Sequence, residues 1–223
     1  MTLTSVKVTK QYFRKAKDRN VFLAVKETDI TIESGVFTEI TGRSGSGKST
    51  LLNMLSGLLA PTSGKVLLDG TDVYALTDAE RSRLRNGKIG VIPQGHTALS
   101  ALTVLENVLL PCRMYGEECY EDRAKELLSM VGISELFQAY PSELSGGELR
   151  RLSIARALIR KPGIILADEP TGDLDDENTR NVLEILRKEA LSGSAVLLVT
   201  HEKEAEKYAD VLYRMNDGVL ERM

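Results

Sequence analysis

The segment that most constrains this chain is GRSGSGKST at residues 42–50, a glycine-rich loop that ends in a lysine and two hydroxyls. Gly42 and Gly47 let the backbone turn tightly, so successive N–H groups can point toward one centre. Lys48 then reaches the β- and γ-phosphates of a nucleoside triphosphate, and the Ser49 hydroxyl can ligate Mg²⁺. The loop has the pattern of a Walker A phosphate-binding loop. The predicted nucleotide-binding residues of this loop are Gly42, Arg43, Ser44, Gly45, Ser46, Gly47, Lys48, Ser49 and Thr50.

The residues on either side of the loop support this interpretation. Apolar residues over 36–40 have the character of a strand, and leucines over 51–55 recur at helical spacing. A strand, a loop and the N-terminus of a helix together favour anion binding. The alternative, a glycine-rich turn without a ligand, explains the pattern less well.

The composition indicates an intracellular protein with a full hydrophobic core. The chain has 223 residues, and its 29 basic and 32 acidic residues give a net charge of −3. The charges form no long block of one sign, which argues against a nucleic-acid partner. No apolar run is long enough to span a membrane. Cys112 and Cys119 have neither a CxxC nor a zinc spacing, so reduced thiols are the simplest interpretation and a disulfide between them the minor one.

A second motif, GIILADEP at residues 163–170, is an apolar strand that ends in two carboxylates. Open α/β sheets place their chemistry at the carboxyl ends of strands. The pattern is typical of a Walker B motif, in which Asp168 would hold Mg²⁺ and Glu169 would act as general base toward water. Acidic pairs after strands are also common as helix caps or surface residues, and this alternative is open for the motif taken alone.

A third motif, LSGGE at residues 144–148, precedes a helix with apolar residues at helical spacing. Ser145 and Glu148 have the spacing of a capping box, which explains these two residues structurally. It does not explain Gly146 and Gly147, each of which weakens a first helical turn by roughly 1 kcal/mol. A phosphate close to this helix N-terminus would account for all four residues.

In this order and spacing, the three motifs resemble the nucleotide-binding subunit of an ATP-binding cassette (ABC) transporter, and the resemblance covers essentially the whole chain. LSGGE is similar to the family's LSGGQ signature, with Glu148 in place of the commoner glutamine. Gln94 matches the Q-loop glutamine, Asp175 the D-loop aspartate and His201 the switch histidine. Tyr12 resembles the aromatic residue that stacks on adenine, with a surface tyrosine as the rival reading.

The resemblance implies an ATPase with ATP and Mg²⁺ in its site. Glu169, His201, Gln94 and Lys48 would be the catalytic residues, and Ser49, Gln94 and Asp168 would be the metal ligands. Ser145, Gly146, Gly147 and Glu148 would bind the nucleotide held by a second copy of the chain, in a head-to-tail homodimer with two ATP molecules at its interface.

The implied fold is a P-loop NTPase domain: a parallel α/β core, an N-terminal antiparallel β subdomain near Tyr12, and an inserted α-helical lobe. We expect a single domain over residues 1–223, with the core and β subdomain at 1–93 and 144–223 and the lobe at about 94–143. Thr103 and Glu106 form a plausible capping box for the first lobe helix.

Finer features resemble the macrolide-exporter, lipoprotein-releasing and FtsE-like branch of the family. A subunit of this branch works with a separate membrane permease, so we expect it at the cytoplasmic face of the membrane, with the permease contact near residues 98–102 and 114–120. One alternative is an ATP-driven regulator or force transmitter that moves no substrate. Soluble ABC ATPases of translation or DNA repair are disfavoured, because they typically carry two cassettes or a long coiled-coil insertion.

Overall fold

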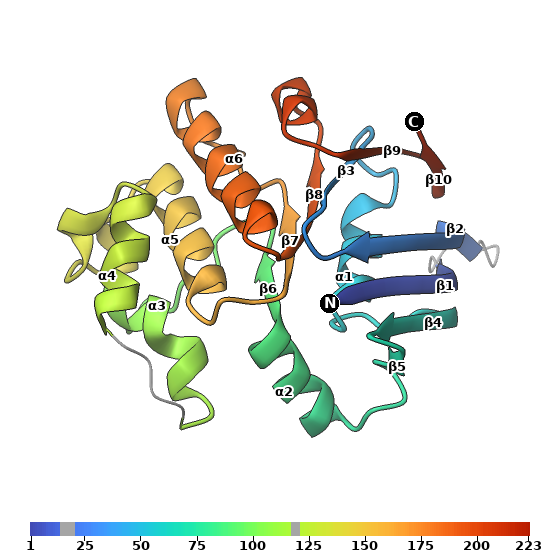
Figure 1. The fold of residues 1–223 in the computed structure, drawn as a ribbon, viewed down its shortest axis with the longest axis horizontal. Helices are drawn as coiled ribbons and strands as arrows, with labels where there is room; N and C mark the ends of the chain where they lie inside the picture. The colour runs from blue at the N-terminus through green and yellow to red at the C-terminus, as the bar shows by residue number, and fades with distance from the viewer. Residues whose placement is uncertain (14–20, 117–120) are drawn as a thin grey trace.

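Two β-sheets and a group of helices make up the structure (Figure 1). The computed structural model describes residues 1–13, 21–116 and 121–223. The strands are β1 (Thr2–Phe13), β2 (Val21–Glu33), β3 (Phe37–Thr41), β4 (Ser63–Leu68), β5 (Thr71–Asp72), β6 (Ile89–Ile92), β7 (Ile164–Asp168), β8 (Ala195–Thr200), β9 (Val211–Asn216) and β10 (Val219–Arg222). The α-helices are α1 (Lys48–Leu55), α2 (Asp78–Lys88), α3 (Val104–Arg113), α4 (Glu121–Met130), α5 (Gly146–Leu158) and α6 (Asp176–Leu191). Short 3₁₀ helices are η1 (Ser134–Leu136), η2 (Pro141–Glu143) and η3 (Lys203–Lys207).

The central sheet has six strands in the order β10-β9-β3-β8-β7-β6. Its neighbouring strands run parallel, except that β10 pairs antiparallel with β9. The strands β3, β6, β7 and β8 lie where the apolar runs of the sequence predicted strands. Because these strands are parallel, their carboxyl ends lie at one edge of the sheet, and the parallel α/β core predicted from the sequence is confirmed.

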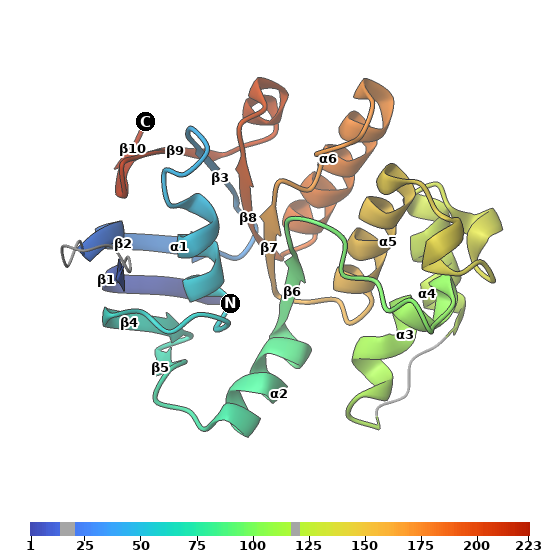
Figure 2. The same ribbon diagram turned by 180° about the vertical axis from the view of Figure 1, so that it is seen from behind.

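Both faces of this sheet are buried, which explains why its strands are almost continuously apolar. Side chains alternate between the faces along each strand. Ile40 and Leu197 belong to a cluster with α1 and the second sheet, whereas Phe37 and Leu198 belong to a cluster with α3, α4, α5 and α6. Figure 2 shows α1 on the side of the second sheet, away from the helices α3–α5.

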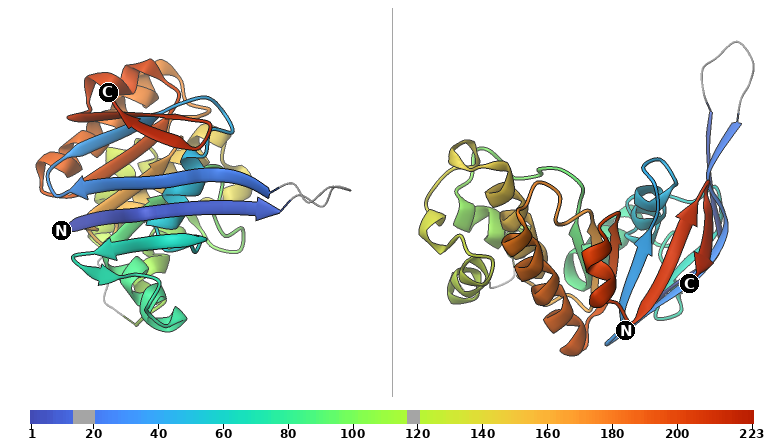
Figure 3. Two further views of the ribbon diagram at one scale, coloured as in Figure 1. Left: turned by 90° about the vertical axis from the view of Figure 1, so that its right-hand side faces the viewer. Right: turned by 90° about the horizontal axis from the view of Figure 1, so that it is seen from above.

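The second sheet has the order β2-β1-β4-β5 and is antiparallel throughout. Its long strands β1 and β2 are seen clearly in Figure 3. Tyr12 lies near the end of β1, so the predicted N-terminal antiparallel portion is confirmed. The charged stretch 14–20, interpreted from the sequence as a loop, lies outside the described residues.

The helices α3, α4 and α5 pack side by side at the opposite end of the molecule (Figure 1). The capping box of α3 is present as expected: Glu106 N–H donates to Thr103 Oγ1 at 3.3 Å, and Thr103 N–H donates to Glu106 Oε2 at 3.0 Å. The fully buried Asn107 amide then accepts from Leu99 N–H at 2.8 Å and donates to Leu102 O at 3.0 Å. These bonds fix the segment that leads from the central sheet into α3.

Within the residues that the structure describes, no helix combines the length and the apolar character that crossing a bilayer requires. The expectation of reduced thiols is wrong for Cys112, which is disulfide-bonded. Cys119 lies outside the described residues.

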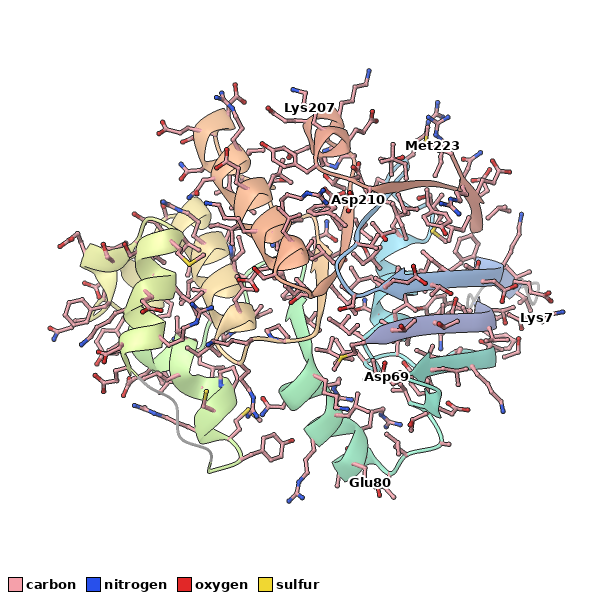
Figure 4. The ribbon with its side chains drawn as sticks, in the orientation of Figure 1. Lys7, Asp69, Glu80, Lys207, Asp210 and Met223 are labelled. Carbon is pink, nitrogen blue, oxygen red and sulfur yellow. The ribbon has the colours of Figure 1, made fainter. Side chains whose placement is uncertain are left out.

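An ion pair joins α6 to the central sheet. Asp210, labelled in Figure 4, accepts from Arg187 Nη2 at 2.9 Å and from Phe37 N–H at 2.9 Å. Its own N–H donates to Phe37 O at 2.8 Å. The hydrogen bonds from Arg187 hold the pKa of Asp210 below its ordinary value. The pair therefore anchors the start of β3, the strand that leads into the glycine-rich loop.

A carboxylic acid is buried in the same strand. Glu39 is fully buried, and neither carboxylate oxygen has a hydrogen-bond partner among the described residues. Burial, with a smaller contribution from the charge of Glu206, raises the pKa of Glu39 to about 7 from 4.5. Burying the ionised form is costly, so Glu39 is protonated in the folded chain at mildly acidic pH.

Glu39 should make the stability of this protein fall as pH rises. Between pH 4.5 and 7 the folded state binds more protons at this site than the unfolded state, so the free energy of unfolding decreases with pH. Glu39→Gln removes this ionisation and should raise the free energy of unfolding by about 2 kcal/mol more at pH 8 than at pH 5. Urea denaturation at the two pH values measures this difference. The exposed Glu33→Gln is the control, and an equal effect of Glu39→Gln at both pH values would contradict the prediction.

Candidate functional site

The glycine-rich loop joins β3 to α1 and is folded against two other strands. Gly47 has φ 109°, and a Cβ added there would lie 2.2 Å from Ala24 O in β2. A Cβ added to Gly42 would lie 2.2 Å from Met215 O in β9. Glycine is therefore required at both positions by close backbone approach as well as by the turn.

The ammonium group of the loop lysine is hydrogen-bonded to backbone carbonyls of the same loop. Lys48 is the first residue of α1 and is buried. Its Nζ donates to Gly42 O at 2.7 Å and to Arg43 O at 3.1 Å. The ammonium group thus lies inside the curve of the loop, at a helix N-terminus, where the helix dipole and free N–H groups favour an anion.

Asp168 ends β7 and is buried beneath the loop. It is hydrogen-bonded to Ser49, whereas its Oδ1 is buried and has no partner among the described residues. Burial raises the pKa of Asp168, and the nearby Glu169 adds to the increase. The Ser49 hydrogen bond and the charges of Lys48 and Arg150 act in the opposite direction. A buried carboxylate oxygen without a hydrogen-bond partner among the described residues, beside the Ser49 hydroxyl, suits a cation that also binds phosphates.

The next residue, Glu169, is held in a strained backbone conformation. Its φ of 49° is in the left-handed region, which costs a residue with a side chain about 1 kcal/mol or more. Its N–H donates to Val199 O at 2.8 Å. Its carboxylate oxygens are both engaged: Thr200 Oγ1 donates to Oε2 at 3.2 Å, and His201 Nδ1 lies 2.9 Å from Oε1. The hydrogen bond to Glu169, followed by the charge of the same group, raises the pKa of His201.

Lys48, Glu169 and His201 face a cleft of about 880 Å³, whose lining does not include the predicted residues Gly42 and Asp168. The cleft brings together predicted residues from four parts of the chain: the loop residues 43–50, Tyr12, Gln94, and the pair of Glu169 and His201. Gln94 follows β6, Glu169 follows β7 and His201 follows β8. The parallel sheet explains the convergence of the loop, Gln94, Glu169 and His201, because each follows the carboxyl end of a strand, whereas Tyr12 comes from β1 of the antiparallel sheet.

The predicted residues of the LSGGE motif lie outside this cleft. Ser145, Gly146, Gly147 and Glu148 are absent from its lining. The capping box itself is present, since Ser145 N–H donates to Glu148 Oε2 at 2.7 Å and Glu148 N–H donates to Ser145 Oγ at 3.3 Å. The backbone and side-chain hydrogen bonds from Ser145 lower the pKa of Glu148. A Cβ on Gly147 would lie 3.2 Å from Leu174 Cδ2. Close packing against Leu174 is therefore a second explanation for a glycine at this position.

Phe22, Thr200 and Arg150 are among the residues of the site that were not predicted from the sequence. Phe22 lines the cleft beside Tyr12, its direct partner in the β1–β2 register. Thr200 binds Glu169, and Arg150 reaches the cleft from α5. The Arg150 side chain could have been suspected, because it lies one helical turn before the apolar Ile154 on a buried face. The Phe22 pairing depends on a register that three irregularities shift along the strands, and no local pattern reveals it.

The comparisons with known proteins agree on one family. The family model described as ABC transporter matches residues 25–172. The lipoprotein-releasing system ATP-binding protein LolD of Shewanella frigidimarina is 44% identical over 196 residues, which cover 86% of this chain and 82% of that protein. The macrolide export ATP-binding/permease protein MacB of Mannheimia succiniciproducens is 43% identical over 220 residues, which cover 98% of this chain. This chain spans only 34% of the length of that MacB protein.

The structural comparison gives the same result. The dimeric structure of MJ0796, described as a bacterial ABC transporter cassette, has a TM-score of 0.91 at 35% identity and covers 99% of this chain. This chain covers 98% of that one. A second dimeric structure of MJ0796, in a post-hydrolysis state bound to ADP and Pi, also has a TM-score of 0.91, at 34% identity.

The contact between the loop and β2 makes a prediction about Gly47. Gly47→Ala would place a Cβ 2.2 Å from Ala24 O, whereas Gly35→Ala has a similarly positive φ of 81° and no atom within 4 Å. Both variants have the backbone strain, but only the first has the clash. We expect Gly47→Ala to lower the free energy of unfolding by at least about 2 kcal/mol more than Gly35→Ala. Urea denaturation of both variants tests this, and equal losses would contradict the packing argument.

Proposed function

Because this chain belongs to the ABC transporter family, as an ATP-binding cassette, we propose that it hydrolyses ATP as the nucleotide-binding subunit of a membrane complex. The observation that carries the proposal is the position of four groups in and beneath one cleft: Lys48 and Ser49 from the loop, Asp168 at the end of β7, and Glu169 directly after it. The loop binds triphosphate in this proposal, and Lys48 exchanges its two backbone carbonyl acceptors for phosphate oxygens.

Asp168 and Ser49 are the proposed protein ligands of Mg²⁺. The unpartnered Oδ1 of Asp168 and the adjacent Ser49 hydroxyl fit a cation that needs oxygen ligands. No cluster of three or more His, Cys, Asp or Glu side chains suited to a metal is present among the described residues. A site with few protein ligands is what Mg²⁺ bound with substrate phosphates requires. When bound, the ion would neutralise charge on the phosphates. Gln94, which lines the cleft, would be a further ligand of the ion.

Glu169 is the proposed general base. It would accept a proton from a water molecule whose oxygen attacks the γ-phosphorus, while the bond from the γ-phosphorus to the ADP oxygen breaks. Thr200 and His201 each hold one oxygen of its carboxylate, which fixes the direction of the remaining lone pairs. His201, whose side chain is 69% exposed, is also proposed to contact the γ-phosphate. In this way the strained conformation of Glu169 is used for positioning.

Tyr12 is the proposed contact for the adenine ring. Its side chain is 41% exposed and lines the cleft together with Phe22 and Ala24. Lys10 Nζ lies 5.6 Å from the centroid of the Tyr12 ring, a cation–π distance that restrains the ring's orientation. A ring of this kind binds a base through stacking and needs no hydrogen bond to it.

A second copy of the chain would complete each site. Ser145, Gly146, Gly147 and Glu148 form a capped helix N-terminus outside the chain's own cleft, which is the position expected if they contact nucleotide bound by the other subunit. The dimeric state of the similar MJ0796 cassette supports this proposal. ATP would then be part of a two-fold interface, and hydrolysis would remove the phosphate that closes it.

The partner of this dimer would be a membrane permease that holds it at the cytoplasmic face of the membrane. A groove of about 330 Å³ lies between the central core and the helices α3–α5, and its lining includes Arg85, Asn86, Pro111, Met114, Tyr115 and Arg160. Met114 is 64% exposed, and Leu99 beside the buried Asn107 is 48% exposed. We propose this region as the docking site and residues 94–143 as the lobe that carries it. The names of the relatives, macrolide export and lipoprotein release, support transport as the coupled task.

Replacement of the general base should separate ATP binding from hydrolysis. With Glu169→Gln, we expect phosphate release to fall by at least about 100-fold, because the amide cannot accept the proton, while ATP still binds. The variant should then accumulate as a dimer with ATP, as measured by light scattering after size-exclusion chromatography. Lys48→Ala is the control that should remain monomeric. A Glu169→Gln chain that stays monomeric with saturating ATP would contradict the dimer model.

A charge placed in the docking region should uncouple the subunit from its permease. We expect Met114→Glu to reduce the yield of the membrane protein that co-purifies with the wild-type chain by at least about fivefold. The ATPase activity of the isolated subunit should be unchanged. Leu191→Glu is the matched control, since Leu191 is 70% exposed at the end of α6, away from the groove. Equal recovery of the permease with both variants would place the docking site elsewhere.

A further inference from the structure

One arginine in the cleft has no role in the function proposed above. Arg150 lies near the start of α5 and is 3% exposed. Its Nη1 donates to Pro93 O at 2.7 Å, and its Nε is buried without a hydrogen-bond partner among the described residues. Removing a guanidinium from water is costly unless acceptors and opposite charges surround it. The position of Arg150 therefore needs an explanation from its neighbours.

The neighbours of Arg150 are the acidic residues of the site. Burial lowers the pKa of Arg150, and the charges of Asp173, Asp168 and Glu169 act against that shift. Its Nη2 lies 3.8 Å from the position of a Cβ added to Gly172, so the guanidinium is packed against the segment that follows Glu169. Arg150 thus has two kinds of partner: the backbone just before Gln94, and the acids at the end of β7 and in the following turn.

The helix that carries Arg150 also carries the LSGGE motif. Ser145 caps α5, and Arg150 follows five residues later, about 7.5 Å along the helix axis. Ser145 and Gly147 lie outside the chain's own cleft, whereas Arg150 lines it. In the proposed dimer, the helix α5 is therefore connected to both nucleotides. Its N-terminus would contact the nucleotide bound by the other subunit, and Arg150 lines the cleft for the nucleotide of its own chain.

We propose that Arg150 is a positioning residue for hydrolysis, an inference that rests on the ATPase function proposed above. Its guanidinium bonds the backbone before Gln94, packs against the segment that follows Glu169, and is attracted by the charge of Asp173 in that segment. It does not contact the reacting phosphorus or water. By holding these segments, it sets the placement of Glu169 relative to α5, so that hydrolysis proceeds only when the helix is correctly seated.

The first test is steady-state ATP hydrolysis by the full chain with Arg150→Gln. We expect kcat to fall at least about tenfold with KM within about threefold of wild type, because the binding loop is unchanged and only the placement of the base is lost. Arg150→Lys should recover part of kcat, since it keeps the charge but cannot bridge two segments as a planar guanidinium does. Arg123→Gln is the matched control, because within the described part of the chain Arg123 also has a buried Nε with no hydrogen-bond partner, but it lies on α4. Its kcat should stay within about twofold of wild type.

The second test uses the exposed Asp173, whose replacement leaves the core intact. Asp173→Asn should lower kcat by itself and have little further effect in the Arg150→Gln chain, because the two side chains act through one interaction. In the Glu169→Gln background, Arg150→Gln should still form the ATP-dependent dimer, which a merely structural defect would prevent.

The outcomes separate this inference from the proposed function. A wild-type chain that does not hydrolyse ATP would overturn the proposed function itself. If the wild type is active and Arg150→Gln retains its kcat, the positioning role is wrong. It is also wrong if the Arg150 and Asp173 effects are additive, or if Arg150→Gln loses dimer formation together with kcat. Should Arg150→Gln fail to fold, Arg150→Lys and Asp173→Asn decide, and unchanged kcat in both would overturn the inference.

Discussion

The site depends on the parallel pairing of β3, β8, β7 and β6. Because these strands run in one direction, the loop after β3, the carboxylates after β7 and the histidine after β8 meet at one edge of the sheet. Burial of both sheet faces keeps this edge rigid: α1 and the antiparallel sheet cover one face, and the helices α3–α6 cover the other. The side chains of the site are thus brought together by hydrophobic packing on the two faces of the sheet, away from the site itself.

The edge itself concentrates charge that water no longer screens. Lys48, Asp168 and Arg150 are each less than a tenth exposed, and their charges act on one another. In such a setting each ionised group depends on its opposite partners, and an unpartnered carboxylate oxygen next to the phosphate-binding loop is available to a ligand. The unpartnered Asp168 Oδ1 and the loop carbonyls that hold Lys48 show this arrangement at the position where phosphate and metal are proposed to bind.

Local features of the site could be predicted from the sequence because their partners are few residues apart. The capping boxes of Thr103 with Glu106 and of Ser145 with Glu148 are examples, and both are present in the structure. The turn glycines Gly42 and Gly47 were also recognisable, although their contacts with β9 and β2 were not. The bond from Arg150 to Pro93 joins residues 57 positions apart, and no sequence period encodes that pairing. The same is true of Phe22 beside Tyr12, since bulges shift the register between β1 and β2.

The sequence by itself determined the order of the elements, the phosphate-binding loop, the strand that delivers two carboxylates, and the family to which these motifs belong. These features depend on hydrogen bonds and side-chain periodicity within short segments, which composition and spacing specify directly. Only the tertiary structure decided that Glu169 is held between Thr200 and His201, that Glu39 is buried with no hydrogen-bond partner among the described residues, and that Arg150 reaches its own chain's cleft. Such contacts depend on strand order and helix orientation, and these are set by the packing of the whole core.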